Sequence, residues 1–241
     1  MKYIFKIFRF DPEKDKEPYF QEYEYDFLPS ISILEALITI RDEVDSSLSF
    51  RYSCRGAVCG SCGMIINGNP DLACRVKLET LYPDEIVIEP LANFEILKDL
   101  IVDMGPFWKA YREIRPYLHT KNKPPEKEHR ISEKAMEKIY PFVNCILCAC
   151  CYSACPVVSK DENYLGPAAL AKLYRFVKDP RDHRPYSFLK RINTQEGAWG
   201  CHTIFKCVEA CPKEVRPVDG IEGLRRKLII EKIKRLLRFR K

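Results

Sequence analysis

The stretch Ser53–Arg75 reads SCRGAVCGSCGMIINGNPDLACR and holds four of the twelve cysteines of this 241-residue chain. The four are spaced Cys54-x4-Cys59-x2-Cys62-x11-Cys74. Three glycines lie next to or between the first three cysteines, at Gly56, Gly60 and Gly63. Glycine allows a backbone to fold tightly and to turn its amides toward sulfur atoms. The stretch therefore predicts a compact loop in which four thiolates converge.

Four converging thiolates can hold a two-iron cluster or a single zinc ion. A spacing of x4 followed by x2 is that of the plant-type [2Fe–2S] site. Structural zinc sites more often use two CxxC-like knuckles, which this glycine-rich loop does not contain. We expect a [2Fe–2S] cluster here, with a structural zinc site as the alternative.

The residues around this loop predict a mixed α/β unit. Alternation of apolar and polar residues indicates strands at Lys2–Phe10, Gln21–Phe27, Met64–Ile66 and Glu85–Glu89. Ser32 with Glu35 forms a capping-box pattern that opens a helix to about Val44. Asn67-Gly68 is a strong hairpin turn signal. The order is strand, strand, helix, cysteine loop, hairpin and strand.

Two further cysteine runs lie in the second half of the chain. They are Cys145-x2-Cys148-x2-Cys151-x3-Cys155-Pro156 and Cys201-x5-Cys207-x3-Cys211-Pro212. The first has the bacterial spacing in which the fourth cysteine binds the other cluster of a two-cluster protein. Aligning the runs pairs Cys201 with Cys145, Cys207 with Cys151 and Cys211 with Cys155. Ile204 then stands where the first run has Cys148.

Ligands shared between the two runs predict two clusters. A [4Fe–4S] cluster would receive Cys145, Cys148, Cys151 and Cys211. The other would receive only Cys155, Cys201 and Cys207. Because Ile204 cannot hold a corner iron, we expect [3Fe–4S] there, with an exogenous ligand to a fourth iron as the alternative. Cys150 belongs to neither set, and we interpret it as a small buried hydrophobe beside the cluster.

The rest of the chain has a helical pattern. Motifs that it lacks exclude several classes of function. Helical periodicity covers Phe94–Leu118, with a break near Gly105-Pro106. It also covers Ser132–Tyr140, Pro167–Val177 and Gly220 to the end. We place a domain boundary near residue 105, between residues 1–104 and 105–241. No apolar stretch is long enough for a membrane span, no signal peptide is evident, and no GxGxxG or GxxxxGK[ST] is present. So many thiols committed to metal favour a reducing compartment.

The formal charge of +6 is concentrated in a basic tail. Leu224–Lys241 contains nine Lys or Arg and one acid, so the remaining chain is close to neutral. The basic residues could face anionic headgroups, or could form the solvated face of a packed helix. We favour a mixture, in which one apolar face packs and the basic face lies near a membrane. Those considered for the headgroups are Arg225, Arg226, Lys232, Lys234, Arg235, Arg238 and Arg240. No aromatic platform accompanies them, so we expect no nucleic-acid partner.

Three clusters of these types in this order resemble the iron–sulfur subunit of succinate dehydrogenase and fumarate reductase. The resemblance spans nearly the whole chain. It rests on Ser53–Arg75, on CILCACCYSACP (Cys145–Pro156), on LGPAALAKLYRFVKDPRD (Leu165–Asp182) and on CHTIFKCVEACPK (Cys201–Lys213). It implies an α+β chain: an N-terminal β-grasp, plant-type ferredoxin-like domain, followed by an all-α bacterial two-cluster ferredoxin-like domain.

The resemblance also implies a role in electron transfer, with no substrate site on this chain. Electrons would pass between the FAD of a flavoprotein subunit and a quinone at a membrane anchor, through [2Fe–2S], [4Fe–4S] and [3Fe–4S]. FRFDP (Phe8–Pro12) and FQEYEYD (Phe20–Asp26) are most similar to the branch anchored by a diheme cytochrome b. The expected location is peripheral, on the cytoplasmic face of the cell membrane. Alternatives are a free-standing multi-cluster carrier and the equivalent subunit of a thiol-linked fumarate reductase.

The resemblance places a quinone near the three-iron cluster. The matching residues are Pro156, Val157, Val158, Ser159, His202 and Thr203. Ser159-Lys160 stands where several relatives carry tryptophan, a departure compatible with menaquinone. A surface imidazole, or one paired within the core, is the alternative interpretation of His202.

Overall fold

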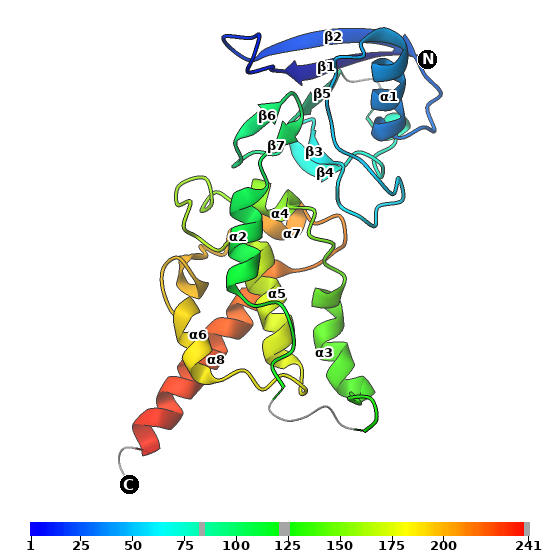
Figure 1. The fold of residues 1–241 in the computed structure, drawn as a ribbon. Helices are drawn as coiled ribbons and strands as arrows, with labels where there is room; N and C mark the ends of the chain where they lie inside the picture. The colour runs from blue at the N-terminus through cyan, green and yellow to red at the C-terminus, as the bar shows by residue number, and fades with distance from the viewer. Residues whose placement is uncertain (82–84, 121–125, 239–241) are drawn as a thin grey trace. The chain divides into compact units, whose positions relative to one another are not determined.

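The computed structural model describes residues 1–81, 85–120 and 126–238. The chain divides into two compact units. The first contains Met1–Gly105 and Ile146–Ala154, and the second contains Pro106–Cys145 and Cys155–Lys241. All strands of the described residues belong to the first unit, and the longest helices belong to the second (Figure 1). An N-terminal sheet part followed by a helical part agrees with the coarse fold predicted from the sequence.

A five-stranded mixed sheet forms the body of the first unit, in the order β2-β1-β5-β3-β4. The strands are β1 (Lys2–Arg9), β2 (Tyr19–Asp26), β3 (Gly63–Ile66), β4 (Asn69–Leu72) and β5 (Ile86–Glu89). β1 pairs with β5 in parallel, and the other neighbours are antiparallel. Alternate residues of β1 are buried, including Phe5 and Ile7, because successive side chains of a strand point to opposite faces.

Helix α1 (Ile33–Thr39) supplies the other half of this core. The amide of Glu35 donates to Ser32 Oγ at 3.3 Å, and Glu35 Oε2 accepts from the amide of Ser32 at 2.7 Å. This is the predicted capping box. A π-helical turn, η1 (Ile40–Val44), continues the helix to the predicted end. The buried side of α1 packs in one cluster with Phe5 of β1.

The predicted helix over Phe94–Leu118 is wrong in its first half. β6 (Ile96–Lys98) and β7 (Ile101–Val102) form a two-stranded hairpin, and helix α2 covers only Gly105–Glu113. The hairpin turns at Asp99, which is buried and accepts from Arg9 Nε at 3.0 Å and from the amide of Ser49 at 2.9 Å. These distant partners override the local helical pattern.

The second unit is built on three longer helices, α3 (Glu133–Val143), α5 (Gly166–Lys178) and α8 (Pro217–Arg238). α5 packs against both α3 and α8 (Figure 1). The remaining helical segments are α4 (Cys150–Ser153), α6 (Tyr186–Leu189), α7 (Lys206–Glu209), η2 (Leu78–Thr80), η3 (Lys190–Ile192) and η4 (Ala198–Gly200). Of the helices in the described part of the chain, none combines the length and the apolar character that crossing a membrane requires.

Candidate iron–sulfur sites

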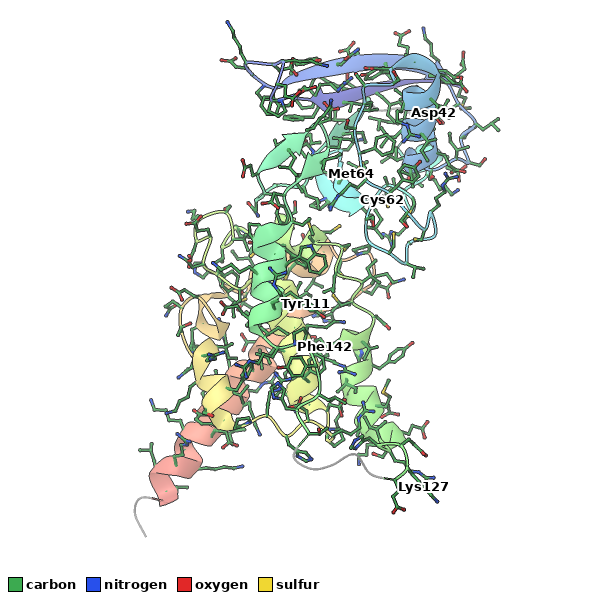
Figure 2. All side chains as sticks on the ribbon, in the orientation of Figure 1. Asp42, Cys62, Met64, Tyr111, Lys127 and Phe142 are labelled. Atoms are coloured by element: carbon green, nitrogen blue, oxygen red, sulfur yellow. The ribbon has the colours of Figure 1, made fainter. Side chains whose placement is uncertain are left out.

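The hairpin of β3 and β4 brings two cysteines of the first set together. Cys62 directly precedes β3, and Cys74 follows β4 by one residue. The amide of Ala73 donates to the carbonyl of Cys62 at 3.0 Å, which closes the open end of the hairpin. Figure 2 shows Cys62 beside Met64, which is buried in the core of the unit. The predicted Asn67-Gly68 turn at the other end of the hairpin therefore brings Cys62 and Cys74 together.

The other two cysteines lie in a loop whose amides point at sulfur. Cys54 Sγ accepts from the amides of Gly56 (3.4 Å), Val58 (3.4 Å) and Cys59 (3.2 Å). Cys59 Sγ accepts from Cys54 (3.4 Å) and Ser61 (3.5 Å), and Cys74 Sγ accepts from Ala57 (3.3 Å). Positive φ angles make this possible, at Arg55, Ala57 and Gly60. Such donors stabilise negative charge on sulfur ligands.

Burial and these hydrogen bonds give the thiols different acidities. Burial alone would raise the pKa of Cys59, but hydrogen bonds from Cys54 and Ser61 lower it to about 6. Burial raises the pKa of Cys62 to about 12. A metal ligand must be deprotonated, so a buried thiol such as Cys62 releases its proton only when metal replaces it.

The segment Ile146–Ala154 belongs to the first unit and carries Cys148 and Cys151. A hydrogen bond from the Cys150 thiol lowers the pKa of Cys148. The same bond, followed by burial, raises the pKa of Cys150 well above its ordinary value. Cys150 is fully buried, in the same core cluster as Cys62. Cys150 is thus buried, as predicted, and it also contacts the candidate ligand Cys148.

The two later cysteine runs have the same backbone conformation in the predicted register. Leu147 and Ala149 have φ of 58° and 65°, and their counterparts Thr203 and Phe205 have 58° and 66°. A single helical turn follows each, α4 in the first run and α7 in the second. In both runs, the carbonyl of the residue before the turn, Ala149 or Phe205, accepts hydrogen bonds from two backbone amides. Ile204 therefore occupies the structural position of Cys148.

Cys145 and Cys211 lie in the second unit and pack against one small core. That core consists of Phe142, Ala171 and Val215. Cys211 Sγ accepts from the amide of Val215 at 3.3 Å. Two cysteines that are far apart in sequence thus pack on the same core. Figure 2 shows Phe142 in this helical unit.

Lys172 is a functional candidate that the sequence analysis missed. Its Nζ donates to the carbonyls of Cys145 at 3.1 Å and Phe142 at 3.4 Å. Burial lowers the pKa of Lys172, and the Cys145 sulfur opposes that shift. A half-buried amine therefore stands beside a candidate cluster ligand.

The three cysteines of the last set line one cavity in the second unit. The cavity is small and partly open to solvent. Its lining includes Cys155, Cys201, Cys207, Tyr164 and Ile204, with apolar residues making up most of the rest. Three thiols around one mainly apolar space suit a polynuclear cluster. In the described part of the chain, no three His, Cys, Asp or Glu side chains are close enough to hold a single metal ion.

Tyr164 is a second residue that no sequence signal marked. It is almost fully buried in this cavity wall. Burial raises its pKa, and the sulfurs of Cys201, Cys155 and Cys207 raise it further. Burial likewise raises the pKa of Cys207 to about 12. The phenol thus remains protonated and can donate to sulfur.

Arg225 fixes the position of Cys201 from helix α8. Its guanidinium donates to the carbonyl of Cys201 at 2.5 Å and to that of Ala198 at 2.8 Å, and it pairs with Glu222 at 2.6 Å. The expectation that Arg225 faces lipid headgroups is therefore wrong. Of the other basic residues of the tail, Arg240 lies outside the described residues.

The predicted quinone residues separate into two groups. Pro156, Val157, His202 and Thr203 line the cavity of the third cysteine set. Ser159 is exposed, and its hydroxyl donates to the carbonyl of Pro156 at 2.8 Å. Val158 is buried. His202 is exposed, so its ring is open to solvent at the edge of the cavity.

Comparisons with known proteins agree with this division into cluster sites. A family model described as a 2Fe-2S iron-sulfur cluster binding domain matches residues 4–109. A second, described as a 4Fe-4S dicluster domain, matches residues 142–215. The first contains the glycine-rich loop, and the second contains both later cysteine runs.

Relatives match over almost the entire chain. The fumarate reductase iron-sulfur subunit of Haemophilus influenzae is 39% identical over 228 residues, which covers 90% of this chain and 89% of the relative. The succinate dehydrogenase iron-sulfur subunit of Coxiella burnetii is 39% identical over 230 residues, covering 94% and 97%. A chain of the Mycobacterium smegmatis Sdh1 complex in the apo form has the same fold, with a TM-score of 0.88 at 22% identity, covering 96% and 97%.

Proposed function

The chain belongs to the family of iron–sulfur subunits of fumarate reductase and succinate dehydrogenase, which are electron-transfer subunits of oxidoreductase complexes, and we propose how it performs that transfer. It carries electrons between the FAD of a flavoprotein subunit and a quinone at a membrane anchor of the cytochrome b type, and its residues are compatible with menaquinone. The observation that carries this proposal is that one chain contains three sets of cysteines, each in a separate structural environment.

Each proposed cluster has a defined set of ligands. The plant-type, β-grasp domain of residues 1–104 holds [2Fe–2S] through Cys54, Cys59, Cys62 and Cys74. The two-cluster domain of residues 105–241 holds [4Fe–4S] through Cys145, Cys148, Cys151 and Cys211. It holds [3Fe–4S] through Cys155, Cys201 and Cys207. The amides that point at the first set, and the shared core of Cys145 and Cys211, support these assignments.

The cavity of the third set supports a cluster with three protein ligands. Ile204 shares that cavity with the three thiols and has no atom that can bind iron. When bound, such clusters supply one-electron redox centres. The chain's own residues hold their sulfurs in place: Arg225 through the Cys201 carbonyl, and the Thr203 amide, which donates to Cys201 Sγ at 3.4 Å. Pro156, His202 and Thr203 on the same cavity support a quinone site at its edge, and Ser159 belongs to that proposal by sequence alone.

The end of α8 supports a peripheral position on the cytoplasmic side of the membrane. Five apolar residues there are between 46% and 60% exposed: Ile229, Ile230, Ile233, Leu236 and Leu237. Their spacing puts them on one face of the helix. Exposed cations accompany them at Arg226, Lys227, Lys232, Lys234 and Arg235. An apolar face beside several cations complements the anionic headgroups and acyl boundary of a lipid surface.

Low-temperature electron paramagnetic resonance (EPR) on the complex purified through a tag on this chain tests the proposal. We expect a three-iron signal in the oxidised state, a two-iron signal on reduction, and co-purification of a flavoprotein and a cytochrome. A zinc-containing, EPR-silent preparation would overturn the cluster assignment. A soluble monomer active with unrelated reductases would overturn the role as a dedicated subunit.

A further inference from the structure

Two glycines of the [2Fe–2S] loop lie directly against the segment that carries Cys148. A Cβ placed on Gly60 would stand 3.0 Å from both Cα and Cβ of Cys148 and from the carbonyl oxygen of Ile146. A Cβ placed on Gly63 would stand 3.0 Å from the carbonyl oxygen of Cys148 and 3.6 Å from Cys150 Sγ. All of these residues belong to the first unit. A side chain at either position would require its neighbours to shift by a few tenths of an ångström.

The contact joins two sets of candidate ligands through one continuous core. Gly60 lies between Cys59 and Cys62, and Gly63 follows Cys62 directly. Cys62 and Cys150 are buried in the same cluster of residues, and Cys148 packs on that cluster. A ligand of the first cluster and a ligand of the second are thus separated by little more than glycine backbone.

Separate hydrogen bonds hold the Cys148 segment in this position. Asn93 Nδ2 donates to the carbonyl of Tyr152 at 3.0 Å and to that of Ser153 at 2.9 Å. The amide of Ala92 donates to Ser153 Oγ at 2.9 Å. Phe94 stacks on Tyr152 with ring centroids 4.9 Å apart. These contacts attach the segment to the sheet unit at Tyr152 and Ser153, just after the residues that the two glycines meet.

We propose that Gly60 and Gly63 are positioning residues that set the separation between the [2Fe–2S] loop and Cys148, and with it the electronic coupling of the first two clusters. This inference rests on the proposed function, because it assumes both ligand sets. Electron tunnelling weakens steeply as the separation of two centres grows. Packed interiors have no spare volume, so a methyl group at either position displaces Cys148 or the loop.

The test compares variants of the complex that differ in what the new side chain meets. Gly63→Ala and Gly63→Val insert a small and a larger group against the Cys148 carbonyl, at a position without positive φ. Gly60→Ala adds a methyl group at φ +75° against Cys148. Gly68→Ala is the matched control, since it has φ +76° and nothing within 4 Å of its Cβ.

The readout is the magnetic interaction between the reduced clusters, measured as the microwave power that saturates the [2Fe–2S] EPR signal. With both clusters at full occupancy, we expect that power to fall in Gly63→Val and Gly60→Ala, to fall less in Gly63→Ala, and to stay unchanged in the control Gly68→Ala. Selective loss of the [4Fe–4S] signal in the Gly63 variants would also support positioning of Cys148.

Two outcomes would overturn the inference. One is wild-type saturation in Gly63→Val with both clusters present. The other is an equal change in Gly68→Ala, which would assign the effect to the strain of an alanine at positive φ. Absence of both cluster signals from the wild-type complex is a different result, because it would overturn the proposed function itself.

Discussion

Ile204 occupies in the second cysteine run the position that Cys148 occupies in the first, each between two residues of positive φ. Thr203 and Phe205 flank Ile204 as Leu147 and Ala149 flank Cys148. The backbone is thus already shaped to present a thiol at residue 204. The isoleucine side chain there has no atom that can bind iron.

Ile204→Cys is therefore expected to convert the three-iron cluster to [4Fe–4S]. The new thiolate would complete four ligands with Cys155, Cys201 and Cys207. We expect the oxidised three-iron EPR signal to disappear and the iron content to rise by one per chain. Ile204→Ala is the matched control and should keep the three-iron signal. An unchanged signal in Ile204→Cys would contradict the alignment of the two runs.

Lys172→Met is expected to lower the midpoint potential of the [4Fe–4S] cluster. The half-buried ammonium next to Cys145 favours the more negative, reduced state, as a nearby positive charge does. At an effective dielectric of about 20, its removal is worth about 1 kcal/mol or more, which is roughly 50 mV for one electron. An EPR redox titration measures the shift.

Two variants control for charge and for position. Lys178→Met makes the same charge change at an exposed site on α5, and solvent should screen it to a much smaller effect. Lys172→Arg keeps the charge and should stay near the wild-type potential. Equal shifts in Lys172→Met and Lys178→Met would mean that Lys172 does not act locally on the cluster.

Local patterns in the sequence predicted most of the first unit. The Ser32 capping box and the Asn67-Gly68 turn depend only on neighbouring residues, and both are present. The hairpin of β6 and β7 could not be predicted in this way. Its turn residue Asp99 is held by Arg9 and Ser49, which are distant in sequence. The helical pattern of this segment was overridden by contacts with residues that lie far outside any local sequence window.

The candidate sites show the same difference between what local sequence and what distant contacts determine. Cysteine spacing predicted which thiols group, and the structure places Cys155, Cys201 and Cys207 around one cavity. Tyr164 and Lys172 were missed because no sequence pattern shows burial beside sulfur, although Lys172 lies within the Leu165–Asp182 stretch that carries the resemblance. Their importance comes from burial beside sulfur and from carbonyls brought near by helix packing. Ligand type is a property of the sequence, whereas the environment of a ligand is a property of the fold.

The apolar face of α8 predicts binding to anionic vesicles. The full chain should co-sediment with vesicles that contain anionic lipid and much less with zwitterionic ones. A triple change of Lys232, Lys234 and Arg235 to Gln should weaken binding by about 3 kcal/mol, at about 1 kcal/mol per cation near the surface. Ile229→Ser with Ile233→Ser should weaken binding to both kinds of vesicle.

A matched change away from this face is Lys2→Gln with Lys6→Gln, in strand β1 of the other unit. It should leave vesicle binding unchanged. If the wild-type chain ignores anionic vesicles yet binds the purified anchor subunit, the face docks on protein, and the lipid assignment is wrong.

Asp45→Asn is expected to destabilise the first unit by about 1–3 kcal/mol, because it weakens a buried polar network. Asp45 accepts from Arg9 Nη1 at 2.5 Å, from the Tyr23 hydroxyl at 2.7 Å and from the Ser47 hydroxyl at 2.6 Å. Burial would raise the pKa of Asp45, but hydrogen bonds from Ser47, Tyr23 and Arg9 hold it well below its ordinary value. Urea unfolding followed by circular dichroism measures the loss.

The pH dependence follows from the direction of that shift. A carboxyl group whose folded pKa is depressed contributes stability above its unfolded pKa of about 3.9, and loses it as pH falls toward the folded value. The difference between wild type and Asp45→Asn should therefore stay constant from about pH 8 to pH 5, where the carboxylate is ionised in both states. Asp42→Asn, at an exposed neighbouring position, should change stability little. A difference that shrinks already between pH 8 and pH 5 would show that the Arg9 network does not depress the pKa of Asp45.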